Sequence, residues 1–265
     1  MQLMYRLRKI LFNLTPKYNS TIYTACKRYV DHYNGDNNSN MLANGEINFI
    51  KGHAENWNTV FDVGAHRGHW TQAVLSVNSE AQVHCFEPFP DVFKILLSNN
   101  FHKQVHLNQL ALSVSAGTST MYVRGINGCN SLYDRQWTFD GSREDHETIT
   151  IQMTSVDEYC HKHNIEKIDM MKMDVEGSEM NVLRGADEML RQGKIGCIQF
   201  EYDRSYIDAK IWLRDMFELL QPLGYQMGKI YPGEVKIYPK YDQRLENFAN
   251  ANWVAQLKSA FNKGD

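Results

Sequence analysis

Acidic side chains follow several apolar runs of this sequence, at positions where they could surround one ligand. Asp62 lies within the run VFDVGA, Glu87 ends QVHCFE, and Asp174 and Glu176 lie in MKMDVEGSE. Glu201 follows a further apolar run, in IQFEYD. A buried carboxylate is costly unless it is paired or has a function. The acids therefore indicate a ligand site more strongly than a purely structural role.

The stretch VFDVGAHRG reads as a strand, a tight turn and the start of a helix. Gly64 and Gly68 enclose Ala65 and His66, and a glycine turn lets the backbone approach a ligand in front of a helix N-terminus. Alone, this turn is a weak signal. Glu87 follows after about twenty residues, where Rossmann-type folds place an acid against ribose hydroxyls. A carboxylate suits a vicinal diol because its two oxygens accept both hydroxyl protons.

The residue types at this turn favour one class of cofactor over another. In the dinucleotide fingerprint G-x-G-x-x-G, the middle glycine lets the backbone approach a pyrophosphate. His66 occupies that place here, and its bulk disfavours NAD. Asp62, two residues before Gly64, favours a cationic ligand such as S-adenosylmethionine, whose amino group binds a carboxylate or its bound water. The alternative is that Asp62 only caps the turn through its side chain.

The block MKMDVEGSE places further acids near the same ligand. Asp174 ends a predicted central strand, and ligands of open α/β sheets lie outside the carboxyl ends of the strands. We therefore expect Asp174 and Glu176 to face the same crevice as Asp62 and Glu87, with Lys172 as a structural partner of one acid. Such a cluster could also bind Mg²⁺ or Ca²⁺. Without a D-x-D-x-D-G loop, the sequence favours a site with no metal.

The elements that must position these acids alternate along the chain from residue 59. This alternation predicts an α/β fold with a mostly parallel, seven-stranded sheet and right-handed crossovers. TSTMYVR and TITIQM predict a β-rich insertion, and GYQMGKIYPGEVKIYP predicts an antiparallel edge hairpin before a last edge strand. The parallel strands are predicted at 59–65, 82–88, 105–113, 168–175 and 195–202. The helices are predicted at 69–77, 91–99, 156–164, 178–192 and 209–220.

The first part of the chain differs from this pattern. We expect a helical extension over residues 1–50 and one Rossmann-like domain over 51–265. The basic, amphipathic residues 1–14 could make weak peripheral contact with a membrane. Docking of this helix on its own domain or on a partner subunit is the favoured interpretation, because a few basic residues give little membrane affinity. An oligomer is therefore possible.

Composition excludes several other classes of protein. The net charge is -3 and basic residues are scattered, which speaks against a nucleic-acid partner. The five cysteines are odd in number and form no C-x-x-C pair, which favours a reducing, cytoplasmic location. No apolar run reaches transmembrane length. No G-x-S-x-G or H-E-x-x-H motif supports hydrolase or zinc chemistry.

Six blocks of the sequence resemble the FkbM family of S-adenosylmethionine-dependent methyltransferases. The resemblance covers about Val60 to Asp203, and its most specific part is K-x-D-V-E-G-x-E, from Lys172 to Glu179. One departure is His66 with Arg67, where many members carry Asn and a small or apolar residue. The blocks are VFDVGAHRGHWT, FEPFPDVFKILLSNN, LNQLALS, TSVDEY, IDMMKMDVEGSEMNVLRGA and IQFEYD.

This resemblance implies a class I methyltransferase fold, S-adenosylmethionine as cofactor and O-methylation, commonly of a sugar hydroxyl in a glycan or glycoconjugate. Asp174 is the first candidate for the base or for orienting the acceptor, and Glu176 and Glu201 come next. The predicted cofactor contacts are Asp62, Gly64, Ala65, His66, Gly68, Glu87, Pro88, Leu110, Ala111 and Asp174.

A polar and aromatic loop over residues 125–147 is the predicted wall for the acceptor. Ser131, Tyr133 and Trp137 belong to it, and aromatic faces beside polar groups suit a carbohydrate. Two alternatives remain open: a methyltransferase of a small non-sugar metabolite or a peptide, and a scaffold that binds the cofactor without chemistry. The clustered acids argue against a scaffold. The acceptor itself is not readable, because specificity lies in loops rather than in the fold.

Overall fold

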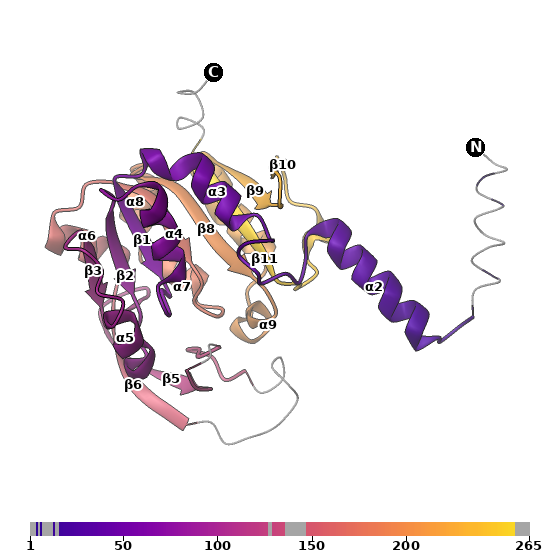
Figure 1. Cartoon of the computed structure of the whole chain (residues 1–265), viewed down its shortest axis with the longest axis horizontal. Helices are drawn as coiled ribbons and strands as arrows, with labels where there is room; N and C mark the ends of the chain where they lie inside the picture. Colours follow the sequence, from indigo (N-terminus) through magenta and orange to yellow (C-terminus); the bar gives the residue numbers. More distant parts are fainter. Residues whose placement is uncertain are drawn as a thin grey trace. The chain divides into compact units, whose positions relative to one another are not determined.

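The computed structural model describes residues 4, 6, 13, 16–126, 129–135 and 147–257, and the chain divides into two compact units, 1–37 and 38–265 (Figure 1). In the first unit, helix α2 spans Ser20–Asn34. The Asn19 side chain caps it by accepting a hydrogen bond from the Ile22 amide at 3.0 Å, and Gly35 ends it in a left-handed conformation. Most of the predicted amphipathic segment 1–14 lies outside the described residues.

The second unit is built on a large sheet whose described strands number eight, in the order β10-β9-β11-β8-β7-β1-β2-β3. The five strands from β8 to β3 are parallel, and the other three pair antiparallel. The predicted α/β fold with an antiparallel edge hairpin is confirmed, but the described sheet has eight strands where seven were predicted. The strands are β1 (Thr59–Val63), β2 (Gln82–Phe86), β3 (Val105–Asn108), β7 (Ile168–Met173), β8 (Ile195–Tyr202), β9 (Tyr225–Ile230), β10 (Val235–Tyr238) and β11 (Ala251–Leu257).

The sequence predicts that the last strand lies at an edge of the sheet, and this prediction is wrong. β11 lies between β8 and β9, and pairs with both. Trp253, Val254 and Ala255 are successive residues of this strand and are all buried, so both of its faces are covered. A strand that is apolar on both faces is stabilised in the interior of a sheet, where its backbone groups also find partners on both sides.

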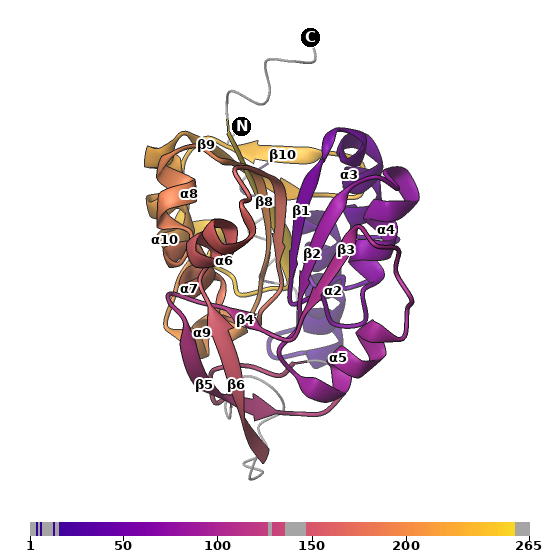
Figure 2. The same cartoon turned by 90° about the vertical axis from the view of Figure 1, so that its left-hand side faces the viewer.

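Helices cover both faces of the sheet (Figure 2). On one face, α3 and α4 pack on Val60 of β1 and Val83 of β2. On the other, α6, α7, α8 and α10 pack on Phe61 of β1 and Met171 of β7. Successive residues of a strand thus pack into the hydrophobic cores on opposite faces of the sheet, as the two-residue period of a strand requires. The helical segments are α3 (Glu46–His53), η1 (Ala54–Asn56), α4 (His69–Val77), α5 (Pro90–Leu97), α6 (Val156–His163), α7 (Glu179–Arg184), α8 (Asp187–Arg191), α9 (Ser205–Ala209), α10 (Leu213–Leu220), η2 (Gln221–Leu223) and η3 (Gln243–Leu245).

Two of the predicted helices are interrupted. The helix predicted at 178–192 is divided into α7 and α8 at Gly185, where a Cβ atom would lie 1.9 Å from the Ser113 carbonyl oxygen. The helix predicted at 209–220 begins only at Leu213, as α10, because Lys210, in a left-handed conformation with φ of 56°, ends the separate short helix α9 at Ala209. Close packing at Gly185 ends α7, and the left-handed conformation of Lys210 ends α9.

The predicted β-rich insertion is confirmed as a second, three-stranded sheet with the order β4-β6-β5. Its strands are β4 (Ala111–Leu112), β5 (Gly117–Val123) and β6 (Glu147–Thr154). The single strand predicted at 105–113 is therefore two strands in different sheets. Asn108 marks the separation, because its side-chain amide donates hydrogen bonds to the carbonyl oxygens of Cys85 and His106 where β3 ends.

Candidate active site

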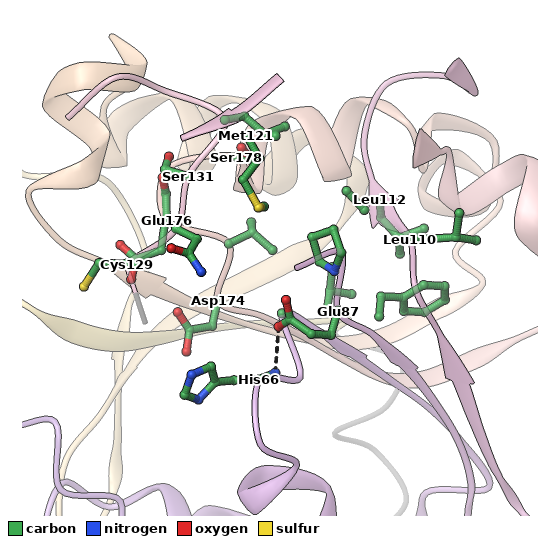
Figure 3. A pocket seen from close by; sticks show the side chains of 18 residues that line it. His66, Glu87, Leu110, Leu112, Met121, Cys129, Ser131, Asp174, Glu176 and Ser178 are labelled. Carbon is green, nitrogen blue, oxygen red and sulfur yellow. Dashed lines mark hydrogen bonds between the residues drawn. The ribbon is translucent and has the colours of Figure 1, made fainter. Parts of the chain in front are cut away.

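A cavity of about 240 Å³ opens at the carboxyl ends of β1, β2 and β7 (Figure 3). It is large enough for an organic ligand, since a water molecule occupies about 30 Å³ in the liquid. The second sheet and the loop after β5 form its other wall. The predicted site residues that line it are Gly64, His66, Glu87, Pro88, Leu110, Ala111, Ser131, Asp174 and Glu176.

The glycine turn after β1 is held by its packing against neighbouring strands. The amides of Gly64 and Ala65 both donate to the Phe86 carbonyl, at 2.9 and 3.0 Å. Gly64 has a φ of 78°, and a Cβ atom there would lie 1.9 Å from the carbonyl oxygen of Asp174. This glycine therefore brings the end of β7 against the turn. Ala65 and Gly68 lie outside the cavity lining.

Glu87 is held in place at the end of β2. One of its carboxylate oxygens accepts a hydrogen bond from the His66 amide at 3.0 Å (Figure 3). The other accepts a hydrogen bond from the Phe89 amide at 2.9 Å. The residue is only 7% exposed, and burial raises its pKa to about 7 against the lowering effect of these hydrogen bonds. Pro88, Leu110 and other apolar residues line the cavity beside it. A rigid carboxylate next to an apolar wall can bind a ligand with a diol and a flat ring.

Lys172 lies between two acids beneath the cavity. Its ammonium is 3.2 Å from Asp174 Oδ2 and 3.8 Å from Asp62 Oδ1. Burial alone would lower the pKa of Lys172, but the two carboxylates outweigh burial and raise it, so the side chain remains charged. Asp62 is fully buried, accepts a 2.6 Å hydrogen bond from Thr71 Oγ1 and lies outside the cavity lining. Burial raises the pKa of Asp62.

Asp174 and Glu201 share a hydrogen bond between carboxyl groups. Burial would raise the pKa of Asp174, but Lys172 and the bond to Glu201 outweigh it and lower the pKa. Burial, together with the neighbouring charge of Asp174, raises the pKa of Glu201 well above its usual range. Asn250 also donates to Glu201 Oε1. The two carboxyl groups therefore share a proton, and these directions favour Glu201 as its site and Asp174, which faces the cavity, as the anion.

Glu176 is paired with a residue that the sequence analysis did not identify. Arg135 Nη1 forms an ion pair with Glu176 Oε2, and Arg135 Nη2 lies 3.6 Å from Asp203 Oδ2. Burial raises the pKa of Glu176 to about 7, although Arg135 acts in the opposite direction. Arg135 belongs to a polar loop, and polar loops carry no periodicity that would predict burial. Its 3% exposure is a property of the tertiary structure.

The predicted acceptor wall is only partly described. Ser131 lines the cavity, and its hydroxyl donates to the Glu176 carbonyl at 2.7 Å. Tyr133 lies outside the lining, and its hydroxyl accepts the side-chain amide of Asn181 at 3.0 Å. Trp137 lies outside the described residues. Ser131 thus supports the turn that holds Glu176, in addition to forming part of the wall.

The described residues also bear on two other classes of site, a metal centre and a membrane-spanning helix. Within the described ranges, no group of three or more His, Cys, Asp or Glu side chains is arranged to hold a metal ion. No helix in the part of the chain that the structure describes combines the length and the apolar character needed to cross a membrane.

Residues 62–227 match the family model described as the methyltransferase FkbM domain, which is more than half of the chain. This chain belongs to the FkbM family of methyltransferases. The family match and the strand order confirm the Rossmann-like, class I methyltransferase fold predicted from the resemblance. In this FkbM methyltransferase the match includes Glu87, Asp174 and Glu201, but it ends before Asn250 and β11.

Several characterised and solved proteins are similar to this FkbM chain. The 2-O-methyltransferase NoeI of Sinorhizobium fredii is 26% identical over 178 residues, which are 61% of this chain and 70% of NoeI. The hexuronic acid methyltransferase AglP of Haloferax volcanii is 30% identical over 149 residues, 55% of this chain and 56% of AglP. A crystal structure of methyltransferase FkbM from Methylobacillus flagellatus KT has a TM-score of 0.47 and 17% identity, covering 75% of this chain and 43% of that chain.

Proposed function

We propose that this protein is an S-adenosylmethionine-dependent O-methyltransferase whose acceptor is a sugar hydroxyl of a glycan or glycoconjugate. The observation that carries the proposal is the Asp174 carboxylate, which lines the cavity, is paired with Lys172 and accepts a hydrogen bond from Glu201. An anion held in this way is suited to take a proton from a hydroxyl group. The family match and the names of NoeI and AglP support a methyl transfer to a sugar.

The residues around Glu87 fit S-adenosylmethionine. The two amides that bind Glu87 fix the plane of its carboxylate, and its oxygens can still accept the two hydroxyls of a ribose, since each oxygen has two lone pairs. Leu110, Leu112 and Met121 offer an apolar surface for an adenine ring. When bound, the cofactor supplies a methyl group on a positively charged sulfur.

Asp174 has the role of general base in this proposal. It would orient the acceptor hydroxyl and take up its proton, while the bound cofactor would supply the methyl group and retain the electron pair of the broken sulfur–carbon bond. Such assistance contributes roughly two to four powers of ten to a rate. Lys172 keeps Asp174 ionised before the transfer, and Glu201 orients the carboxylate through the shared hydrogen bond. The cavity walls would position the acceptor hydroxyl and exclude water.

Calorimetry tests the cofactor, and label transfer tests the acceptor. S-adenosylmethionine and S-adenosylhomocysteine are expected to bind the full-length chain, and binding of NAD alone would contradict the cofactor assignment. With methyl-labelled S-adenosylmethionine, label should pass to neutral methyl glycosides or to uronic acids. Transfer only to peptides or to non-sugar alcohols would contradict the sugar acceptor. Activity that persists in a chelator would support a site without metal.

A further inference from the structure

One wall of the cavity is a short segment, Cys129–Arg135, which we call the strap. Its residues from Cys129 to Leu132 line the cavity. The other lining residues include Glu87 and Asp174, at the ends of the central strands. The strap is joined to β5 by two backbone hydrogen bonds between Tyr122 and Ser131, at 2.8 and 3.2 Å. A ligand in this cavity is therefore enclosed by the main sheet on one side and by the strap on another.

Arg135 ends the strap and joins it to the catalytic edge of the main sheet. Its guanidinium reaches Glu176, in the turn after β7, and Asp203, directly after β8. Arg124 donates a 2.8 Å hydrogen bond to the Arg135 carbonyl and supports it from the end of β5. A second link comes from the Ser131 hydroxyl, which donates to the Glu176 carbonyl. Both links meet at Glu176.

The ion pairs of Arg135 are largely buried, and they hold the strap against Glu176 and Asp203. The Arg135 side chain is only 4% exposed, and those of Glu176 and Asp203 are 18% and 20% exposed. Breaking a buried pair leaves an uncompensated charge, which costs far more than breaking a pair on the surface. The strap can therefore move away from the cavity only if Arg135 and its two acids separate and become solvated together.

We propose that Arg135 is a positioning residue that fastens the strap to Glu176 and Asp203, and so slows the release of cofactor from the cavity. This inference rests on the proposed function, because it takes S-adenosylmethionine and S-adenosylhomocysteine as the ligands. In the same way, Arg135 fixes the Glu176 carboxylate at the wall of the cavity.

The dissociation rate of S-adenosylhomocysteine from the immobilised full-length chain tests this role. In Arg135→Met, we expect the release to be at least about tenfold faster than in the wild type, because one link of the strap is lost. Arg135→Lys keeps the charge and should restore part of the difference. The matched control is Arg191→Met, which removes an arginine from an exposed ion pair with Asp187 and should leave the rate unchanged.

The pH dependence of release distinguishes this link from a merely structural role. Glu176 faces Arg135 and Cys129 of the strap, Asp174 at the end of β7, and Asp203 and Glu201 at the end of β8. Its pKa of about 7 means that lowering the pH from 8 to 6 protonates it and removes its ion pair with Arg135. Release from the wild type should accelerate over this range. Arg135→Met and Glu176→Gln should release rapidly at both pH values.

The outcomes separate this inference from the proposed function. A wild-type chain that does not bind S-adenosylhomocysteine would contradict the proposed function. Normal binding with equal release rates in the wild type and Arg135→Met would overturn the role of Arg135 alone. If circular dichroism shows that Arg135→Met is unfolded, Arg135→Lys and Glu176→Gln provide the test. Wild-type release rates in both would then overturn the inference.

Discussion

At the scale of single residues, the charge of Asp174 is set by its two neighbours. The Lys172 ammonium lies 3.2 Å from Asp174 Oδ2. The hydrogen bond between Asp174 and Glu201 needs a proton, because two carboxylate anions could only accept hydrogen bonds. The same edge of the sheet thus contains two carboxyl groups whose pKa values move in opposite directions, downwards for Asp174 and upwards for Glu201. Two acids whose surroundings move their pKa values apart are typical of acid–base sites.

Replacing Asp174 by Asn tests its role as base. Asp174→Asn removes the proton acceptor and keeps the size of the side chain, so we expect methyl transfer to fall by about a hundredfold or more. Affinity for S-adenosylhomocysteine should stay within a few-fold of the wild type, as measured by calorimetry. The exposed Asp91→Asn is the control. A fully active Asp174→Asn enzyme would remove Asp174 as the base.

Lys172 is expected to set the pH range of activity. In Lys172→Met the attraction that lowers the pKa of Asp174 is lost, so this pKa rises and Asp174 becomes protonated at a higher pH. The acidic limb of the pH–rate profile should move upwards by about one unit or more. Activity on the acidic limb should therefore decrease more than activity at pH 8.5. An unshifted limb would show that Lys172 does not control the ionisation of the base.

At the scale of elements, the turn between β1 and α4 connects the two halves of the site. Gly64 lies in this turn, and the Asp174 carbonyl fills the space in which a side chain would lie. The turn also carries His66, whose amide binds Glu87. One glycine therefore determines how closely the cofactor-binding turn and the end of β7 approach each other.

Gly64→Ala should destabilise the protein and reduce its activity. The added Cβ atom would overlap the Asp174 carbonyl, at a residue whose φ of 78° is unfavourable for alanine. We expect a loss of about 2 kcal/mol or more in the free energy of unfolding, measured with urea. Gly52 in α3 is the matched control, because a Cβ atom there meets nothing within 4 Å. Gly52→Ala should stabilise the protein by about 0.5–1 kcal/mol.

At the scale of the whole molecule, several glutamates keep raised pKa values inside the folded protein. Burial raises the pKa of Glu87 and Glu176 to about 7 and that of Glu179 to about 8. Unfolding returns each group to its ordinary value of 4.5, so between about pH 4.5 and 8 the folded state binds more protons than the unfolded state. Stability from these groups is therefore greatest at the lower end of this range and decreases as the pH rises.

Glu179 is suited to test this linkage, because it is 1% exposed and lies outside the cavity lining. Its carboxyl oxygen Oε1 accepts the Val175 amide at 2.9 Å, and glutamine keeps that acceptor without an acidic proton. At pH 8, Glu179→Gln should be more stable than the wild type, by on the order of 2 kcal/mol. Its free energy of unfolding should also depend less on pH. The exposed Glu218→Gln should show the wild-type dependence, and equal slopes in all three proteins would contradict the linkage.

Local patterns in the sequence were sufficient to predict much of the fold and half of the site. The alternation of apolar runs predicted the parallel strands, and the rule that ligands lie at their carboxyl ends brought Glu87 and Asp174 to one cavity. These predictions succeed because strand period, glycine turns and strand polarity depend on residues close together in the chain. The roles proposed for Glu87 and Asp174 stay predictions until they are measured.

Only the tertiary structure decided which partners the acids have. Arg135 meets Glu176 and Asp203, and Asn250 meets Glu201, across separations of about 40 to 70 residues. The position of β11 between β8 and β9 is equally non-local. Periodicity tells which face of an element is buried, but it does not name the element that covers that face. The sequence by itself therefore determined the carboxylates and the edge where they gather, whereas the folded chain decided their pairing and charge.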